Sequence, residues 1–221
     1  MTPARRYKDD VFEQFARIGK AVASPKRLEL LDILCQGPRT VEVLADQASL
    51  SLANASQHLQ VLRAAGLIEA EKNGLFVTYR LAEGVETFYL ALRGLAEARL
   101  TEVEATTRAF LEARGAMESI DGAELLQRAL SGAVTVLDVR PPEEYRAGHL
   151  PHARSLPLAE LRARLDEVPR DREVVAYCRG PYCVLAIEAV RVLRAEGYTA
   201  VRLESGPPDW RAAGVSVVSG P

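Results

Sequence analysis

The segment VVAYCRGPYC (residues 174–183), followed by VLAIEAVRVL (residues 184–193), decides the fold of the second half of this chain. Its first residues form a continuous apolar run of the kind found in buried parallel strands, and the residues after it repeat apolar side chains at helical spacing. Gly180 and Pro181 forbid regular structure between the two. The pattern predicts a buried strand, a six-residue loop from Cys178 to Cys183, and an amphipathic helix.

Cys178 stands at the carboxyl end of the predicted strand, where the loop wraps over the start of a helix. Unpaired backbone N–H groups and the positive end of the helix dipole favour a thiolate there, so we expect Cys178 to be a nucleophile. The alternatives are two ordinary buried thiols and a structural disulfide. The disulfide is less favoured because the chain has 3 cysteines in 221 residues and a charged start without a signal peptide, which is typical of a cytoplasmic protein.

The length and composition of the chain restrict the classes of protein to which it can belong. A chain of 221 residues allows one large or two ordinary domains. No apolar run approaches the roughly 18 residues of a membrane span, so we expect a cytoplasmic protein that has no membrane partner. Residues 1–115 hold 15 basic and 15 acidic side chains, and residues 116–221 hold 13 and 15. Because neither half is basic, any contact with DNA must come from local arrangement.

The first half shows helical patterns followed by a hairpin pattern. Ser51 begins a helix whose predicted buried stripe is Leu52, Ala55, Leu59 and Leu62. Asn73-Gly74 separates two alternating runs, which is a strong hairpin signal. Two helices joined by a tight break and followed by a hairpin predict a winged helix-turn-helix. The helices are expected at residues 7–23, 26–36, 40–48 and 52–66, and the strands at 67–71 and 76–81.

The strings SPKRLELLDIL (residues 24–34) and SQHLQVLRAAGLIEAEKNGLFVTYRL (residues 56–81) resemble the ArsR/SmtB family of dimeric bacterial repressors, over roughly residues 8–112. The resemblance implies a homodimer that binds double-stranded operator DNA through a recognition helix in the major groove and a wing on phosphates. The alternative for His58 is a capping or core histidine. The expected DNA-binding residues are Ser51, Asn54, Ser56, Gln57, His58, Gln60, Lys72 and Arg80.

This half departs from the metal-sensing members of that family. The expected third helix has no cysteine, the last helix (residues 85–114) has no histidine, and Cys35 stands alone. Soft metals need several converging thiolates or imidazoles, so we expect no metal site. The last helix is predicted to run for about thirty residues, and such length favours a helix–helix dimer interface.

From residue 120 onward strands alternate with helices, which predicts a parallel sheet with helices on both faces. The overall expectation is two domains, a mainly-α winged helix-turn-helix at residues 1–115 and an α/β domain at residues 116–221. Ligand sites in such sheets lie at the carboxyl ends of the strands. Cys178 stands at one such end and Asp138 at another.

The strings LDVRPPEEYRAGHLPHARSLPL (residues 137–158), YCRGPYC (177–183) and GPPDWRAAG (206–214) resemble the rhodanese family, over roughly residues 118–218. The resemblance implies that Cys178 takes a sulfane sulfur as a persulfide. The N–H groups of the loop, including those of Arg179, Gly180, Tyr182 and Cys183, would hold it. Asp138 and Arg140 would either brace the loop or form a purely structural ion pair, and His149 is expected to be scaffold near the mouth.

Two positions of the loop separate the possible chemistries. Relatives of this fold that act on phosphate or arsenate have arginine six places after the cysteine, and here that residue is Val184, so those activities are not expected. Cys183 stands where rhodaneses commonly have a basic or small polar residue. It could resolve a persulfide on Cys178 by thiol exchange, or be buried and silent.

These features predict a transcriptional repressor whose rhodanese-like domain senses or transfers sulfane sulfur from thiosulfate, a persulfide or a polysulfide. No cofactor is expected. The alternatives are a sulfurtransferase enzyme in which DNA binding is secondary, and an arsenite or soft-metal sensor built on Cys178 and Cys183.

Overall fold

The computed structural model describes residues 2–74, 76–114, 119–120, 124, 127–128, 131 and 133–220. These residues form two compact units, Met1–Ala91 and Leu92–Pro221. The division falls inside helix α5 (Val85–Arg99), so this helix belongs to both units. The domain boundary expected at residues 115 and 116 lies outside the described residues, and it stays a prediction.

The first unit packs its helices around one apolar core, in which leucines of α2, α3 and α4 are fully buried. Helix α2 begins at Pro25, where the missing N–H costs nothing. Helix α4 begins after Ser51, whose Oγ accepts a hydrogen bond from the Asn54 N–H at 3.3 Å. The helices are α1 (Pro3–Val22), α2 (Pro25–Leu34), α3 (Val41–Gln47) and α4 (Leu52–Ala64).

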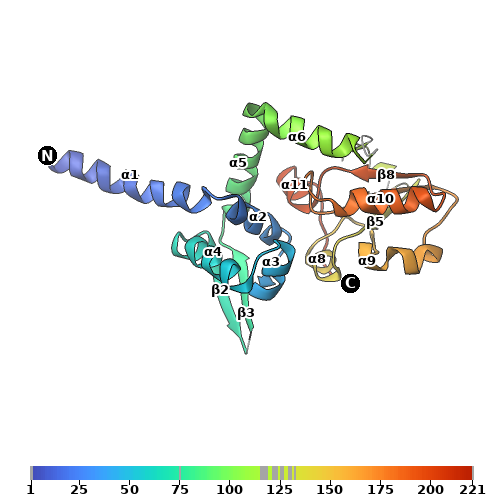
Figure 1. Cartoon of the computed structure of the whole chain (residues 1–221), viewed down its shortest axis with the longest axis horizontal. Helices are drawn as coiled ribbons and strands as arrows, with labels where there is room; N and C mark the ends of the chain where they lie inside the picture. The colour runs from blue at the N-terminus through green and yellow to red at the C-terminus, as the bar shows by residue number, and fades with distance from the viewer. Residues whose placement is uncertain are drawn as a thin grey trace. The chain divides into compact units, whose positions relative to one another are not determined.

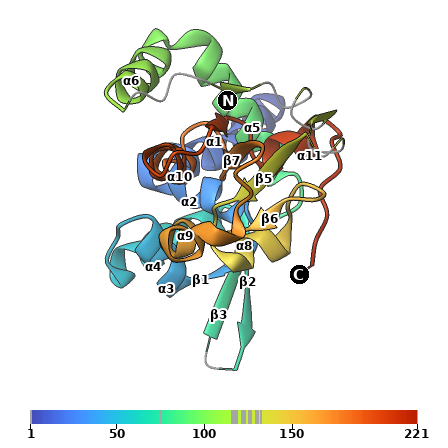
Figure 2. The ribbon, with the colours of Figure 1, turned by 90° about the vertical axis from the view of Figure 1, so that its right-hand side faces the viewer.

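The hairpin follows α4 and projects from the first unit (Figure 2). Strands β2 (Ile68–Asn73) and β3 (Phe76–Leu81) pair antiparallel, and the short β1 (Arg39–Thr40) pairs with the other edge of β3. Asn73 is still paired with Phe76, so the turn does not centre on Asn73-Gly74 as predicted. The expected wing is confirmed, with Asn73 paired within strand β2.

The second unit holds a five-stranded sheet in which each strand pairs with its neighbours in parallel. The strand order is β4-β8-β7-β5-β6. The order places β7, which ends just before Cys178, in the centre of the sheet. The strands are β4 (Ser119–Ile120), β5 (Val134–Asp138), β6 (Arg154–Ser155), β7 (Glu173–Tyr177) and β8 (Ala200–Leu203).

Helices cover both faces of this sheet (Figure 1). Alternate residues of β7 point to opposite faces, so Ala176 packs with α9 and α10 while Tyr177 packs with Trp210 of α11. The predicted architecture is therefore confirmed. The helices are α8 (Pro142–Ala147), α9 (Leu158–Leu161) continued by the 3₁₀ helix η1 (Arg162–Glu167), α10 (Leu185–Ala195) and α11 (Pro207–Ala212). A further helix expected at residues 122–130 lies mostly outside the described residues.

The single helix expected at residues 85–114 is wrong. The chain forms α5 and then α6 (Thr101–Glu112), because Leu100 between them is extended, with φ −111° and ψ 100°. The break lets Phe110 and Leu111 of α6 pack against Ile187 of α10. Tertiary packing of these apolar side chains thus decides a bend that helical periodicity does not encode. None of the described helices is both long and apolar enough to cross a membrane.

Candidate functional site

The cysteine loop, residues 178–183, joins β7 to α10. Cys178 is 2% exposed, and its side chain lies on the α10 side of the sheet among apolar neighbours. Its Sγ donates to the Cys183 carbonyl oxygen at 3.3 Å. Burial raises the pKa of the Cys178 thiol well above its usual value, although backbone N–H groups of Ala186 and Gly180 also reach the sulfur. Cys178 is therefore a protonated thiol inside a partial ring of amides.

Cys183 is the more acidic of the two thiols. A hydrogen bond from the Cys178 thiol lowers the pKa of Cys183 to about 7, and the backbone N–H groups of Arg179 and Leu185 act in the same direction. Both cysteines are free of disulfides. The sequence favoured a thiolate on Cys178, whereas the structure places the lowered pKa on Cys183, because Cys178 is the more completely desolvated sulfur.

Arg179 anchors the cysteine loop to α8. Its Nε lies 3.1 Å and 3.0 Å from the two carboxylate oxygens of Glu144, and its Nη2 lies 2.6 Å from Oε1. The Glu144 carboxylate is completely buried. This bidentate pair directs the charge of Arg179 inward and fixes the backbone next to Cys178.

Asp138 and Arg140 form a second buried pair at the end of the neighbouring strand, β5. The Arg140 Nε donates to Oδ1 of Asp138 at 2.9 Å, and Nη2 donates to Oδ2 at 2.5 Å and to the Gly148 carbonyl at 2.6 Å. The backbone N–H of Arg140 donates to Oδ1 at 3.0 Å. Neither side chain contacts solvent. The pair ties the strand end to the segment before His149, so the bracing of the cysteine loop and the purely structural ion pair both stay predictions.

Gly206 allows a close backbone approach to the cysteine loop. A Cβ added at this position would lie 2.2 Å from the Arg179 carbonyl oxygen, which no side chain tolerates. The Gly206 N–H donates to Oδ2 of Asp209 at 2.8 Å, at the start of α11. The cysteine loop therefore rests directly on the backbone that precedes α11.

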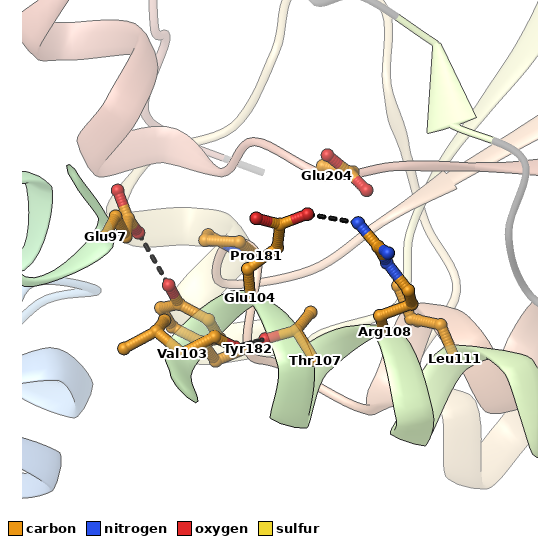
Figure 3. A pocket seen from close by; sticks show the side chains of 9 residues that line it. All are labelled: Glu97, Val103, Glu104, Thr107, Arg108, Leu111, Pro181, Tyr182 and Glu204. Atoms are coloured by element: carbon orange, nitrogen blue, oxygen red, sulfur yellow. Dashed lines mark hydrogen bonds and ion pairs between the residues drawn. The ribbon is translucent and has the colours of Figure 1, made fainter. Parts of the chain in front are cut away.

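Tyr182 lies on the outward face of the cysteine loop, and it is 47% exposed. Its hydroxyl donates to Oε1 of Glu97 on α5 at 2.7 Å, and partial burial together with this carboxylate raises the pKa of Tyr182 to about 12. Figure 3 shows this bond at one end of a cavity of about 350 Å³. Side chains that line the cavity include Glu97, Glu104, Thr107, Arg108, Tyr182 and Glu204.

His149 is held as scaffold, as expected. Its Nδ1 lies 2.8 Å from the Tyr145 carbonyl oxygen, and its ring stacks on that of Tyr145 with centroids 3.6 Å apart. The backbone of His149 also pairs with Val218. Both the ring and the backbone of His149 thus make contacts that hold the local structure.

No group of three or more His, Cys, Asp or Glu side chains in the described part of the chain is placed to hold a metal ion. Cys178 and Cys183 are two thiols, and a soft-metal or arsenite site would need another ligand beside them.

The predicted recognition helix, α4, presents a polar face. Asn54, Gln57 and Gln60 are exposed, and Ser56 and His58 are half-buried. Ala55, Leu59 and Leu62 are buried as predicted, but Leu52 is 50% exposed because it stands at the first turn of the helix, beyond the core. The polar set expected to reach the major groove therefore lies together on one accessible helix.

The remaining candidate DNA contacts have differing surroundings. Ser51 caps α4, and Lys72 is exposed on the hairpin. The Arg80 guanidinium forms an ion pair with Glu69 across the hairpin. Arg80 would have to exchange this carboxylate for a phosphate, so Lys72 is the more available of the two cations.

Sequence reasoning missed Glu144, Arg93, Glu97 and Asp209, all of which contact the cysteine loop or its support. Glu144 lies 35 residues from Arg179 and Glu97 lies 85 residues from Tyr182, so no local pattern joins them. Asp209 gives a local signal, since an acidic residue three places after Gly206 is typical of a helix start.

Comparison with known families locates two matches in this chain. The profile described as a rhodanese-like domain matches residues 121–213, and that described as a helix-turn-helix domain matches residues 22–71. The first match includes the cysteine loop and both buried ion pairs, and the second includes α4.

Individual relatives show the same two parts. The HTH-type transcriptional regulator Rv0324 of Mycobacterium tuberculosis is 44% identical over 215 residues, which cover 96% of this chain and 94% of the relative. A sulfurtransferase of Allochromatium vinosum is 34% identical over 105 residues, 47% of this chain and 96% of that protein. The homodimeric winged helix-turn-helix fragment of Mb0332 from Mycobacterium bovis is 38% identical, with a TM-score of 0.41, and covers 42% of this chain and 87% of that fragment.

Proposed function

Because the chain belongs to the family of ArsR-like winged helix-turn-helix transcriptional regulators that carry a C-terminal rhodanese domain, we propose that it is a repressor that responds to sulfane sulfur through a persulfide on Cys178. The single observation that supports this most is the presence of two free cysteines in one short loop, where the Cys178 thiol donates to the Cys183 carbonyl oxygen at 3.3 Å and the pKa of Cys183 is lowered. Binding to operator DNA is the regulator's output, and it would place the protein in the cytoplasm.

The thiol pair supplies a route to the reactive thiolate. Cys183 accepts the proton of Cys178, and the Cys178 sulfur attacks the terminal sulfur of a donor persulfide, RSSH. The new bond is Cys178–S–SH, the bond that breaks is the donor S–S bond, and RS⁻ leaves. Amides of Gly180 and Ala186 already reach the Cys178 sulfur, so they can stabilise the charge that develops during the attack.

Cys183 can then resolve the persulfide. After Cys183 passes its proton to the departing RS⁻ or to solvent, its thiolate attacks the inner sulfur of Cys178–S–SH, forms a Cys178–Cys183 disulfide and releases HS⁻. A disulfide fixes the separation and the dihedral angle of the two cysteines, which persulfidation alone does not. This second step would therefore change the loop more than persulfidation alone.

A homodimer is the proposed DNA-binding form. Helix α1 has 20 residues, and Ala21 is its buried residue. Tyr7, Phe12 and Phe15 are largely exposed, the last two at 63% and 65%. Exposed aromatic side chains on one long helix are typical of a subunit interface. A two-fold dimer would present two α4 helices to two half-sites.

The test of the sensor proposal is a gel-shift titration. The DNA is a fragment selected from a random-sequence pool by the unmodified protein, and the donor is inorganic polysulfide. We expect polysulfide to change the DNA affinity of the wild type and to leave Cys178→Ser unchanged. An equal change in both proteins would refute the assignment to Cys178.

Mass spectrometry locates the modification. Trypsin cleavage after Arg172, Arg179 and Arg191 places Cys178 and Cys183 in separate peptides, residues 173–179 and 180–191. After polysulfide treatment and alkylation, we expect one additional sulfur on the first peptide in Cys183→Ser. An additional sulfur on the second peptide in Cys178→Ser would instead make Cys183 the primary acceptor.

Sulfurtransferase activity is the second candidate, favoured by the 34% identity over 105 residues of this chain to a protein named sulfurtransferase. Turnover of thiosulfate with cyanide as acceptor tests it. Rapid steady-state turnover that Cys178→Ala abolishes would make transfer the main output, whereas single-turnover behaviour supports the sensor.

A further inference from the structure

Helix α5 contacts the cysteine loop directly. The Tyr182 hydroxyl donates to Glu97 at 2.7 Å, and the same carboxylate lies 3.3 Å from Nε of Arg93 (Figure 3 shows the first contact). Arg93 and Glu97 stand one helical turn apart, so both side chains lie on the same face of α5. Two residues of this helix therefore act together at the outer side of the loop.

Arg93 reaches the inner support of the loop as well. Its Nη2 forms an ion pair with Oδ1 of Asp209, whose other oxygen accepts the Gly206 N–H. Gly206 in turn packs against the Arg179 carbonyl so closely that a Cβ would lie 2.2 Å from it. Because that contact has no free space, displacement of the Arg179 peptide toward Gly206 must also displace Gly206 and Asp209.

The opposite end of α5 is built into the first unit. Val85 and Tyr89 belong to the core of that unit, and the Tyr89 hydroxyl donates to Asp32 of α2 at 3.0 Å. One helix thus holds contacts to the DNA-binding unit at its start and contacts to the cysteine loop near its end. Arg93 and Glu97 lie outside the rhodanese match, which begins at residue 121.

We propose that Arg93 and Glu97 are positioning residues through which the chemical state of the cysteine loop acts on α5 and thereby on DNA binding. This inference rests on the proposed function. Cys178 is 2% exposed and packed in the core, so an added sulfur atom or a bridge to Cys183 cannot be accommodated without movement of the loop. The movement changes the Tyr182–Glu97 and Asp209–Arg93 contacts. Each chemical state of the loop therefore favours a different position of α5.

The experiment compares Glu97→Ala with the matched control Glu102→Ala in the full-length chain. Glu102 is an exposed glutamate on α6 that does not line the cavity. Both variants and the wild type are treated with inorganic polysulfide, and persulfide content and DNA affinity are measured on the same samples. Coupled sites commonly change each other's affinity by about 5–150-fold.

We expect all three proteins to take up sulfur to the same extent. The wild type and Glu102→Ala should show the full change in DNA affinity on modification, and in Glu97→Ala the change should fall below about twofold, beneath the usual range for coupled sites. Glu97→Gln, which retains an oxygen acceptor for Tyr182, should recover part of it. Tyr182→Phe deletes only the hydroxyl and should reproduce Glu97→Ala.

The pKa of the Tyr182 phenol provides a readout that a general destabilisation of the fold would not change. Its pKa of about 12 should fall toward the ordinary 10.0 in Glu97→Ala, measured as the absorbance difference from Tyr182→Phe. A full affinity change in Glu97→Ala at equal persulfide content overturns this inference and leaves the sensor proposal intact. An unchanged DNA affinity in the modified wild type overturns both.

Discussion

At the scale of single residues, the two thiols of the cysteine loop have pKa values shifted in opposite directions. Burial keeps the proton on Cys178, and the hydrogen bond from Cys178 lowers the pKa of Cys183. An ordinary buried cysteine would be inert, but this arrangement places a proton acceptor beside the buried sulfur. Cys183 is therefore the thiol that ionises more readily, and in the proposed function the pair reacts with sulfane sulfur after one of the two sulfurs has lost its proton.

Alkylation by iodoacetamide tests this pair. Cys183, followed in the peptide of residues 180–191, should react with a midpoint near pH 7, because its reactivity follows the thiolate fraction. Cys178→Ala removes the hydrogen bond that lowers the pKa, so the midpoint should rise toward the ordinary value of 9.0. An unchanged midpoint would show that the loop amides, and not the Cys178 thiol, stabilise the Cys183 thiolate.

The buried Asp138–Arg140 pair leads to a prediction about the free energy of unfolding. Asp138→Asn keeps the shape of the side chain but leaves the fully buried guanidinium without its counter-charge, which costs about 3–5 kcal/mol. Denaturant unfolding measures it. The control is Glu160→Gln, which breaks a solvent-exposed pair with Arg164 and should cost about 1 kcal/mol or less. Similar losses in the two variants would contradict the assignment of a buried, uncompensated charge.

At the scale of elements, two close approaches define the site. The cysteine loop lies against the backbone before α11, and α4 presents its amide side chains beside the hairpin. The first approach requires glycine at position 206. The second would, in the proposed function, divide DNA recognition between a helix suited to base edges and a hairpin suited to phosphates.

Gly206→Ala should destabilise the second unit by about 1–3 kcal/mol, because the added methyl group meets the Arg179 carbonyl. Its backbone, at φ −128°, is acceptable for alanine, so the cost is purely one of contact. Gly94→Ala is the control. Gly94 lies within α5 with open space around it, and the substitution should be neutral or stabilise the fold by up to about 1 kcal/mol. Thermal unfolding of the two variants should therefore shift in different directions or by clearly different amounts.

Substitutions in the predicted recognition helix and in the hairpin should weaken DNA binding in different ways. Gln57→Ala should weaken the preferred sequence by about 1–3 kcal/mol and relax specificity, because an amide can bond an adenine edge. Lys72→Ala should weaken all sequences similarly and reduce the slope of log affinity against log salt by about 1. Arg108→Ala, on α6, serves as the charge control. Loss of sequence preference in Lys72→Ala would place the hairpin on base edges instead.

At the scale of the whole molecule, the exposed aromatic side chains that the proposed homodimer would cover lie on α1. A helix of 20 residues whose aromatic side chains are exposed has little reason to be stable alone in water. A partner subunit that covers Phe12 and Phe15 would supply the missing apolar contacts.

The double substitution Phe12→Ser and Phe15→Ser should convert the dimer to a monomer in light scattering coupled to gel filtration. DNA affinity should fall with it, because one half-site contributes far less than two. Tyr182→Phe, on the other unit, is expected to leave the mass unchanged. A double variant that stays dimeric would move the interface to another element.

Much of the fold could be predicted from the sequence because its signals are local. The apolar run before Cys178, the serine that caps α4 and the alternation around the hairpin each act within a few residues. The order of strands and helices then restricts the sheet to a few parallel topologies with helices on both faces. The position of Cys178 at a strand end follows from the same reasoning.

Only the tertiary structure decided the contacts between residues distant in sequence. The break at Leu100, the buried partner Glu144 of Arg179, and the bonds from α5 to Tyr182 and Asp209 join segments up to 116 residues apart. The acidity of the two thiols also depends on which sulfur is more completely desolvated, and that is a property of packing. Local patterns determine elements and their order, whereas burial and long-range pairing determine which groups carry charge.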